Sequence, residues 1–247
     1  MSPWERFPNA PIVEALLDIH VTFSSPIDLQ RLEQFHEAIR DRYPTKQEQV
    51  LWELQFGSDA GAIQQAAKSQ PRGFMFKSAD GRRIVQARRD GFTFNWLKPY
   101  ETWEALREEA HPHWDRYVEM FTPTQITKLG LRYINRLELP LPFNDFREYV
   151  KTAPDIAEGI PQSVSALFMR LEVPKPDSDL VAILTETIEP VIGEDMRLPF
   201  IFDIDVVRTV SIEPSSPDIW ESFERMREYK NNIFFASTTD KAKEMFR

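Results

Sequence analysis

Two Asp-Gly pairs, Asp80-Gly81 and Asp90-Gly91, constrain the fold of this chain more than any other local feature. Runs typical of β-strands flank them at residues 73–79, 82–88 and 92–97. Asp-Gly between such runs favours tight hairpin turns, because both residues tolerate the positive φ that these turns need. The sequence therefore predicts a three-stranded antiparallel meander, which excludes a purely parallel, doubly wound sheet.

The remaining periodicity predicts further strands and helices. Strands are expected at 12–23, 50–56, 126–139, 164–173, 180–189 and 198–212, from period-two or continuous apolar patterns. Helices are expected at 29–43, 101–121, 146–152, 218–229 and 240–246, from helical spacing and capping residues. We expect 57–69 to be a loop or a short helix, Pro112 to kink or interrupt its helix, and Asn231-Asn232 to end theirs.

The order of these elements predicts an α+β fold. Residues 1–123 read strand–helix–four strands–helix, and residues 124–247 read strand–helix–three strands–helix. We therefore expect one compact unit made of two similar halves, an internal duplication, sharing a large and mainly antiparallel sheet with helices on one face. This topology is similar to the saddle of the TATA-binding protein and to helix-grip folds, in which the uncovered face of the sheet binds a partner.

Composition narrows the classes of function. The net charge is −9 and the pI is about 5.1, which counts against general binding to phosphate backbones. Cysteine is absent, so there is no thiolate nucleophile and no cysteine-bound metal. We find no apolar run of about 18 residues and no signal-peptide pattern at the start, and expect a soluble, cytoplasmic protein without membrane contact. Edge strands in a large sheet would allow a homodimer, and the sequence shows no interface for one.

Charged residues recur on one face of the long strands and form the main candidate site. They come from three strands: Glu14, Asp18 and His20, then Arg132 and Arg136, then Asp203 and Asp205. If these strands are neighbours, Asp203 and Asp205 meet Arg132 and Arg136 as cross-strand ion pairs. Two interpretations stay open, a structural ladder of ion pairs and a polar surface that binds a ligand or partner.

Catalytic signatures do not appear in the sequence. It contains no G-x-S-x-G, Walker or G-x-G-x-x-G motif. His111 and His113 point apart on a helix, so we expect no metal site and no cofactor. An enzyme using Glu14, Asp18, His20, Arg132 and Asp205 remains an alternative, and it requires a deep pocket and a carboxylate with a shifted pKa.

A second alternative is nucleic-acid binding through the meander. Arginines cluster there beside the aromatic residues of 92–97, namely Arg82, Arg83, Arg88 and Arg89. Cations interleaved with aromatic rings bind single strands by stacking. The competing interpretation places the aromatic residues in the core and the arginines at an edge.

Three segments carry a resemblance to known sequences. They are PNAPIVEA with its preceding Phe7, GLRYINRL at 130–137 with Leu129 before it, and NIFFASTTDK at 232–241. The chain resembles, over nearly its whole length, a sporadically distributed prokaryotic family of uncharacterised proteins. The resemblance implies an accessory role in mobile or defence-associated gene sets and supplies no catalytic residues. We expect a non-enzymatic protein that binds a protein partner or small ligand through the polar sheet face or an edge.

Overall fold

The computed structural model describes residues 4–59, 62–191 and 196–247 and has the expected α+β fold. Within these residues, nine strands form one sheet in the order β2-β3-β4-β5-β1-β6-β9-β8-β7, and all neighbouring strands are antiparallel. The strands are β1 Ile12–Thr22, β2 Thr45–Asp59, β3 Ala62–Lys77, β4 Arg83–Arg88, β5 Gly91–Leu97, β6 Gln125–Pro140, β7 Phe168–Pro174, β8 Leu180–Ile188 and β9 Arg197–Ile212.

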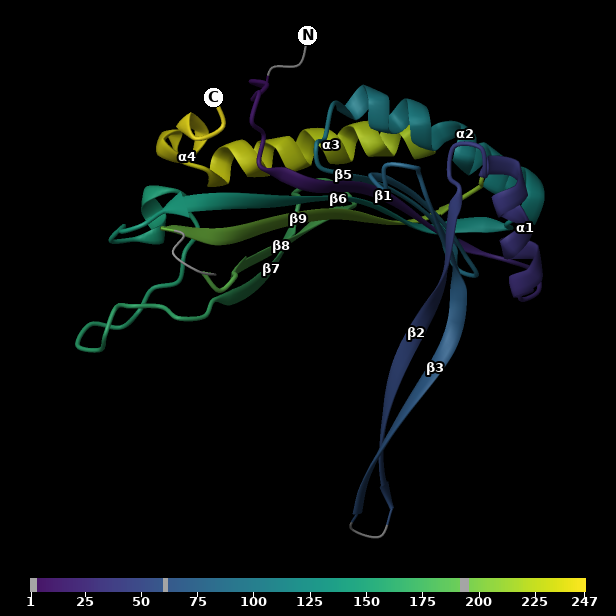
Figure 1. Ribbon diagram of the computed structural model, residues 1–247, viewed down its shortest axis with the longest axis horizontal. Coiled ribbons are helices and arrows are strands. Elements are labelled where there is room, and N and C mark those ends of the chain that lie inside the picture. Colours follow the sequence, from purple (N-terminus) through teal and green to yellow (C-terminus); the bar gives the residue numbers. More distant parts are fainter. Residues whose placement is uncertain (1–3, 60–61, 192–195) are drawn as a thin grey trace.

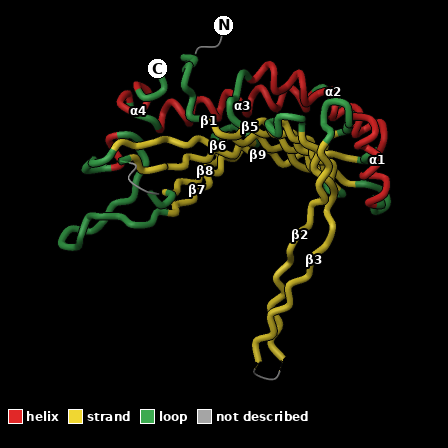
Figure 2. The backbone as a smooth tube through the Cα atoms, in the orientation of Figure 1, coloured by secondary structure: helices red, strands yellow, loops and turns green. Residues whose placement is uncertain are grey.

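The helices lie together on one side of the sheet (Figure 1). They are α1 Leu29–Ile39, α2 Trp103–Phe121, α3 Asp218–Ser237 and α4 Asp240–Glu244, with one 3₁₀ turn, η1 Phe146–Glu148. Figure 2 shows the sheet arching beneath them, with its other side left uncovered. The β2–β3 hairpin extends far from the body on that uncovered side (Figure 1).

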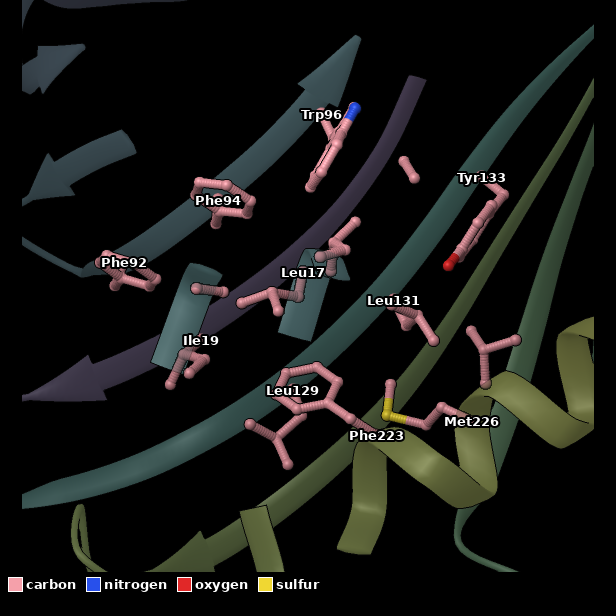
Figure 3. Packing of buried hydrophobic residues seen from close by; sticks show 14 of the residues in the cluster. Leu17, Ile19, Phe92, Phe94, Trp96, Leu129, Leu131, Tyr133, Phe223 and Met226 are labelled. Atoms are coloured by element: carbon pink, nitrogen blue, oxygen red, sulfur yellow. The ribbon is translucent and has the colours of Figure 1, made fainter. Parts of the chain in front are cut away.

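The core fills the space between the sheet and the helices. Alternate residues of the central strands point into it, so that Leu17 and Ile19 of β1 are fully buried. Figure 3 shows these side chains with others of β5, β6 and α3, among them Phe92, Phe94, Trp96, Leu129, Leu131, Phe223 and Met226. Period two thus sends the apolar side chains of each central strand to the helices and the intervening residues to the opposite face.

The predicted meander is confirmed as the C-terminal part of β3 with β4 and β5. Gly81 and Gly91, the glycines of the two Asp-Gly turns, have φ of 71° and 154°. A side chain at Gly91 would also place its Cβ 2.1 Å from the carbonyl oxygen of Ile19 on β1. Glycine is therefore required where β5 begins to pair with both β4 and β1.

Residues 57–59 and 62–69 form β-strand, so the expectation of a loop or short helix over 57–69 is wrong for these residues, and residues 60 and 61 lie outside the described part of the chain. Gln55 pairs with Ala66 and Gly57 with Gln64, which continues the ladder of β2 and β3 almost to the hairpin tip. The segment contains few β-branched residues, so its own propensity does not reveal a strand. Pairing with the residues opposite decides the conformation instead.

Three helix expectations need correction. The interruption expected at Pro112 does not occur: α2 continues through this residue, because the next residues, His113 and Trp114, are buried and hold the helix across one missing hydrogen bond. α3 continues through Asn231-Asn232 to Ser237, since asparagine disfavours a helix by only a fraction of a kcal/mol and Phe234 anchors the following turn in the core. The helix expected at 146–152 is only the single turn η1.

Candidate functional site

Eleven polar side chains gather on the uncovered side of the central strands, and we call this surface the polar face. They come from β4, β5, β1, β6 and β9: Gln86, Arg88, Thr93, Asn95, Glu14, Asp18, His20, Lys128, Arg132, Asp203 and Asp205. The polar face includes six of the seven residues predicted for the main site. Arg136, the seventh, lies further along β6 and binds Glu138 and Glu189 at 2.7 and 2.8 Å, so the expected pairing with Asp203 or Asp205 does not form.

Asp18 is the centre of the first cluster. Its carboxylate accepts a hydrogen bond from Thr93 Oγ1 at 2.6 Å and lies 2.7 Å from His20 Nε2. Arg88 Nη2 lies 2.8 Å from Asp18 Oδ1, and its Nη1 donates to Thr93. Burial alone would raise the pKa of Asp18, but the His20 hydrogen bond and the Arg88 charge outweigh it, so this pKa lies well below its usual range. Asp18 is therefore a fixed negative charge.

Arg132 and Asp203 form the second cluster. The Arg132 Nε and Nη2 atoms donate to the two carboxylate oxygens of Asp203 at 2.9 and 2.6 Å, which is the two-pronged geometry expected of a strong pair. The sequence predicted a cross-strand pair here, and it forms diagonally from β6 to β9. Asp205, although directly opposite Arg132 in the strand register, takes no part in it.

Asp205 is the unpaired carboxylate of the polar face. Among the described residues its side chain forms no hydrogen bond or ion pair, and the same is true of the Lys128 side chain. Burial raises the pKa of Asp205 to about 6, and the positive charges of Arg132 and Lys128 offset the rise only in part. A carboxylate and an ammonium group thus remain available for an external polar group.

A cavity of about 210 Å³ lies between the two clusters. Asp18, Arg88, Lys128, Arg132 and Asp205 all line it. Gly130 lies in its wall, where a Cβ would be 3.5 Å from the Cβ of Asp18 and 3.8 Å from Oδ1 of Asp205. A larger residue at 130 would fill the space between these carboxylates, so glycine keeps the cavity open.

A chain of side-chain amides extends the polar face toward β2. Gln49 donates to Gln86 at 2.6 Å, Gln86 to Asn95 at 2.7 Å, and Asn95 to Glu14 at 2.6 Å. This chain places Glu14 beside the cavity-lining residues without leaving it free. It also links the base of the β2–β3 hairpin to β1.

The four arginines of the nucleic-acid alternative do not gather on one surface. Arg88 is nearly buried on the polar face, whereas Arg83 lies on the helix side, 3.7 Å above the ring of Trp96, and pairs with Glu109. Arg82 and Arg89 are exposed in the turns. The aromatic residues of β5 are in the core (Figure 3), so they offer no stacking platform.

Sequence reasoning missed the contributions of β5, Gln86, Lys128 and Gly130, and it assigned Arg88 to a different site. The signal for β5 was present, since Thr93 and Asn95 alternate with three aromatic core residues. In a strand whose other face is fully apolar, such polar residues mark the opposite face. The ion pairs of Arg88 depend on strand order, which local patterns do not give.

No family model matches the chain, and no curated protein matches it. No group of three His, Asp or Glu side chains in the described parts of the chain is arranged to hold a metal ion. No helix of residues 4–59, 62–191 and 196–247 is long and apolar enough to cross a membrane.

Proposed function

We propose that this protein is a non-enzymatic binding protein that holds a protein partner on its polar face. One observation carries the proposal: a polar surface spanning five strands contains an unpaired carboxylate and an unpaired ammonium group around an open cavity. A structural ladder of ion pairs would account for charged side chains that are paired, but among the described residues Asp205 and Lys128 take part in no ion pair. Leaving charges half-buried without partners costs stability, and binding sites commonly contain such groups.

The shape of the molecule favours a polypeptide over a small ligand. The β2–β3 hairpin and the loop before β7 both extend on the uncovered side of the sheet (Figure 1). A partner lying across the polar face would therefore lie between two projecting segments. Its contact segment would present a cation to Asp205 and a carboxylate or carbonyl oxygen to Lys128.

The first test is site-specific photo-crosslinking in the cells that naturally produce the protein. A photoreactive amino acid replaces Leu16, which lines the polar-face cavity, and in a control it replaces the exposed Glu221 on α3. We expect one protein to crosslink from position 16 and not from position 221. Equal crosslinking from both positions contradicts the proposal, and crosslinks to nucleic acid from position 16 would favour the nucleic-acid alternative.

Affinity measurements with the purified partner then test each of the two charges separately. We expect Asp205→Asn and Lys128→Gln each to weaken binding about tenfold, which is about 1.4 kcal/mol. Asp115→Asn makes the same change as Asp205→Asn on the exposed side of α2 and should leave the affinity unaltered. Unchanged affinity in both polar-face variants would remove this surface from the interface.

An enzyme remains the second candidate because of the environment of Asp205. Its pKa of about 6 suits proton transfer near neutral pH, and the Asp18–His20 pair lies on the same face. Incubation with a mixture of polar metabolites, followed by mass spectrometry, tests this candidate. Turnover in the wild type that disappears in Asp205→Asn supports an enzyme, and no change in any metabolite supports the binding protein.

A further inference from the structure

A second and larger cavity lies on the helix side of the sheet. Its volume is about 510 Å³, within the range of small-molecule sites. Four parts of the chain enclose it: the N-terminal segment from Trp4 to Ile12, residues 98–104, β6 and α3. We call it the aromatic cavity, after the side chains of Trp4, Tyr100, Trp103, Tyr133, Phe234 and Phe235 in its wall.

Lys230 of α3 is the exceptional residue of the aromatic cavity. It continues the inward-facing series of Ile219, Phe223 and Met226, and only 9% of the residue is exposed. Its Nζ lies 3.9 Å from the centre of the Tyr133 ring, a cation–π contact. In the described parts of the chain no carboxylate oxygen lies within 4.0 Å of this Nζ, and no hydrogen-bond acceptor binds it.

The acidic side chains around the cavity are already paired with other cations. Glu104 binds Arg227 at 3.1 Å and Arg6 at 3.5 Å. Glu5 binds Arg247 at 2.9 Å. Lys230 therefore contributes a positive charge that no neighbour neutralises. Burial, together with the nearby Arg227 charge, lowers the pKa of this lysine to about 7.

The walls define the rest of the ligand. Trp4 stacks on Phe235 with ring centres 5.0 Å apart, and Tyr100 and Tyr133 join through their hydroxyl groups at 2.9 Å. Flat aromatic walls favour a flat apolar body. Phosphate groups are commonly bound by several donors at once, whereas Lys230 is the one buried unpaired ammonium group among the described residues that line this cavity, and Lys98, which also lines it, is exposed. One such group suits one carboxylate.

We propose that the aromatic cavity binds a small organic acid with an aromatic body, whose carboxylate pairs with Lys230. This site lies on the opposite side of the sheet from the polar face and does not depend on the function proposed above. The bound acid supplies the anion that Lys230 lacks, and its ring lies against the aromatic walls.

Calorimetric titration with matched ligand pairs tests the proposal. The acids are phenylacetate, 3-phenylpropionate and indole-3-acetate, and each is compared with its own uncharged amide at pH 6.5. We expect at least one acid to bind the wild-type protein at least tenfold more tightly than its amide. Equal binding of acid and amide, or no binding of any acid at millimolar concentration, would overturn the proposal without the use of a variant.

Two lysine variants then test whether the preference for the acid depends on Lys230. Lys230→Met should abolish the preference for the acid over the amide, and Lys151→Met, the same change at an exposed lysine, should preserve it. A structural role for the amine predicts instead that Lys230→Met lowers the thermal midpoint. We expect this midpoint to stay the same or rise, because the variant removes a buried charge without a partner. Preserved acid preference in a folded Lys230→Met protein also overturns the proposal.

Discussion

Two aspartates on one sheet face show how neighbours decide the state of a buried carboxyl group. Asp18 accepts a hydrogen bond from Thr93, lies within 2.8 Å of His20 and Arg88, and stays ionised. Asp205 lies at the edge of the same cavity without a donor, and burial raises its pKa to about 6. Because the residue type is the same, the difference comes from the side chains that adjacent strands bring to each position.

The raised pKa of Asp205 predicts a specific pH dependence of stability. Its folded-state pKa lies above the usual 3.8, so its favourable contribution is complete below about pH 4 and is lost as the pH rises through 6. Asp205→Asn removes this loss, and we expect the variant to be as stable as the wild type at about pH 3.5 and about 1–3 kcal/mol more stable at pH 7. Urea unfolding at both pH values measures the difference. A variant less stable than the wild type at pH 7 would mean that the carboxylate has a structural partner.

For Asp203 we expect the opposite effect: removing its charge should lower the stability of the protein. It accepts both hydrogen bonds from Arg132 and is 7% exposed, so Asp203→Asn leaves a guanidinium group with half of its partner. We expect a loss of about 1–3 kcal/mol in the free energy of unfolding at pH 7. Asp115→Asn on α2 serves as the matched control, with a change below about 0.5 kcal/mol. Equal effects in the two variants would mean that the Arg132–Asp203 pair contributes nothing.

At the scale of elements, the sequence predicts correctly those turns, strands and helix caps whose conformation depends on residues nearby in the sequence. The Asp-Gly turns, the period-two strands and the Thr239 cap of α4 are of this kind, and the structure confirms them. The α3 helix was predicted to end at 229, because Asn231-Asn232 suggests a break. That error concealed Lys230, which appears as a charge within an apolar stripe only when the helix is followed to Phe234. The contact of Lys230 with Tyr133 on β6 depends on tertiary packing and could not be predicted locally.

Substitution of Gly91 tests how closely β5 packs against the neighbouring strands. Gly91→Ala combines an unfavourable φ with a contact of 2.1 Å to the backbone of β1, and we expect it to cost about 2–4 kcal/mol. Gly81→Ala has a similarly unfavourable φ of 71° but no atom within 4 Å of the added Cβ, so we expect about 1 kcal/mol. Chemical denaturation of both variants compares them. Equal losses would show that backbone conformation, and not the contact with β1, explains the requirement for glycine.

At the scale of the whole molecule, the strand order is nearly symmetric about the junction of β1 and β6. The first half of the chain supplies β2-β3-β4-β5-β1 on one side, and the second supplies β6-β9-β8-β7 on the other. Residues 1–123 and 124–247 therefore contribute contiguous blocks of the sheet, as two similar halves would. The internal duplication itself stays a prediction. The three segments behind the family resemblance, far apart in the sequence, all contribute residues to the aromatic cavity.

The N-terminal and C-terminal segments pack against each other, so we expect a change at Phe7 to destabilise the C-terminal helix α4. Phe7 packs against Phe235 and Phe246, with ring centres 5.8 and 5.7 Å apart, and the backbone N–H of Asn9 donates to the carbonyl of Phe246. We expect Phe7→Ala to cost about 2–3 kcal/mol and to speed amide hydrogen exchange in α4. Phe168→Ala makes the same change at a side chain of β7 whose residue is 74% exposed, and should cost less than about 0.5 kcal/mol. Unchanged exchange in α4 would contradict the link between the ends.

The N-terminal segment from Trp4 onward and the C-terminal residues also lie on the helix side, away from the β2–β3 hairpin (Figure 1). An affinity tag, a dye or a sensor surface attached at either end is therefore tethered behind the sheet. Immobilised in this way, the molecule presents its polar face outward to whatever flows past it. The same tether borders the aromatic cavity, whose wall includes Trp4, so measurements on that site are better made with the tag removed.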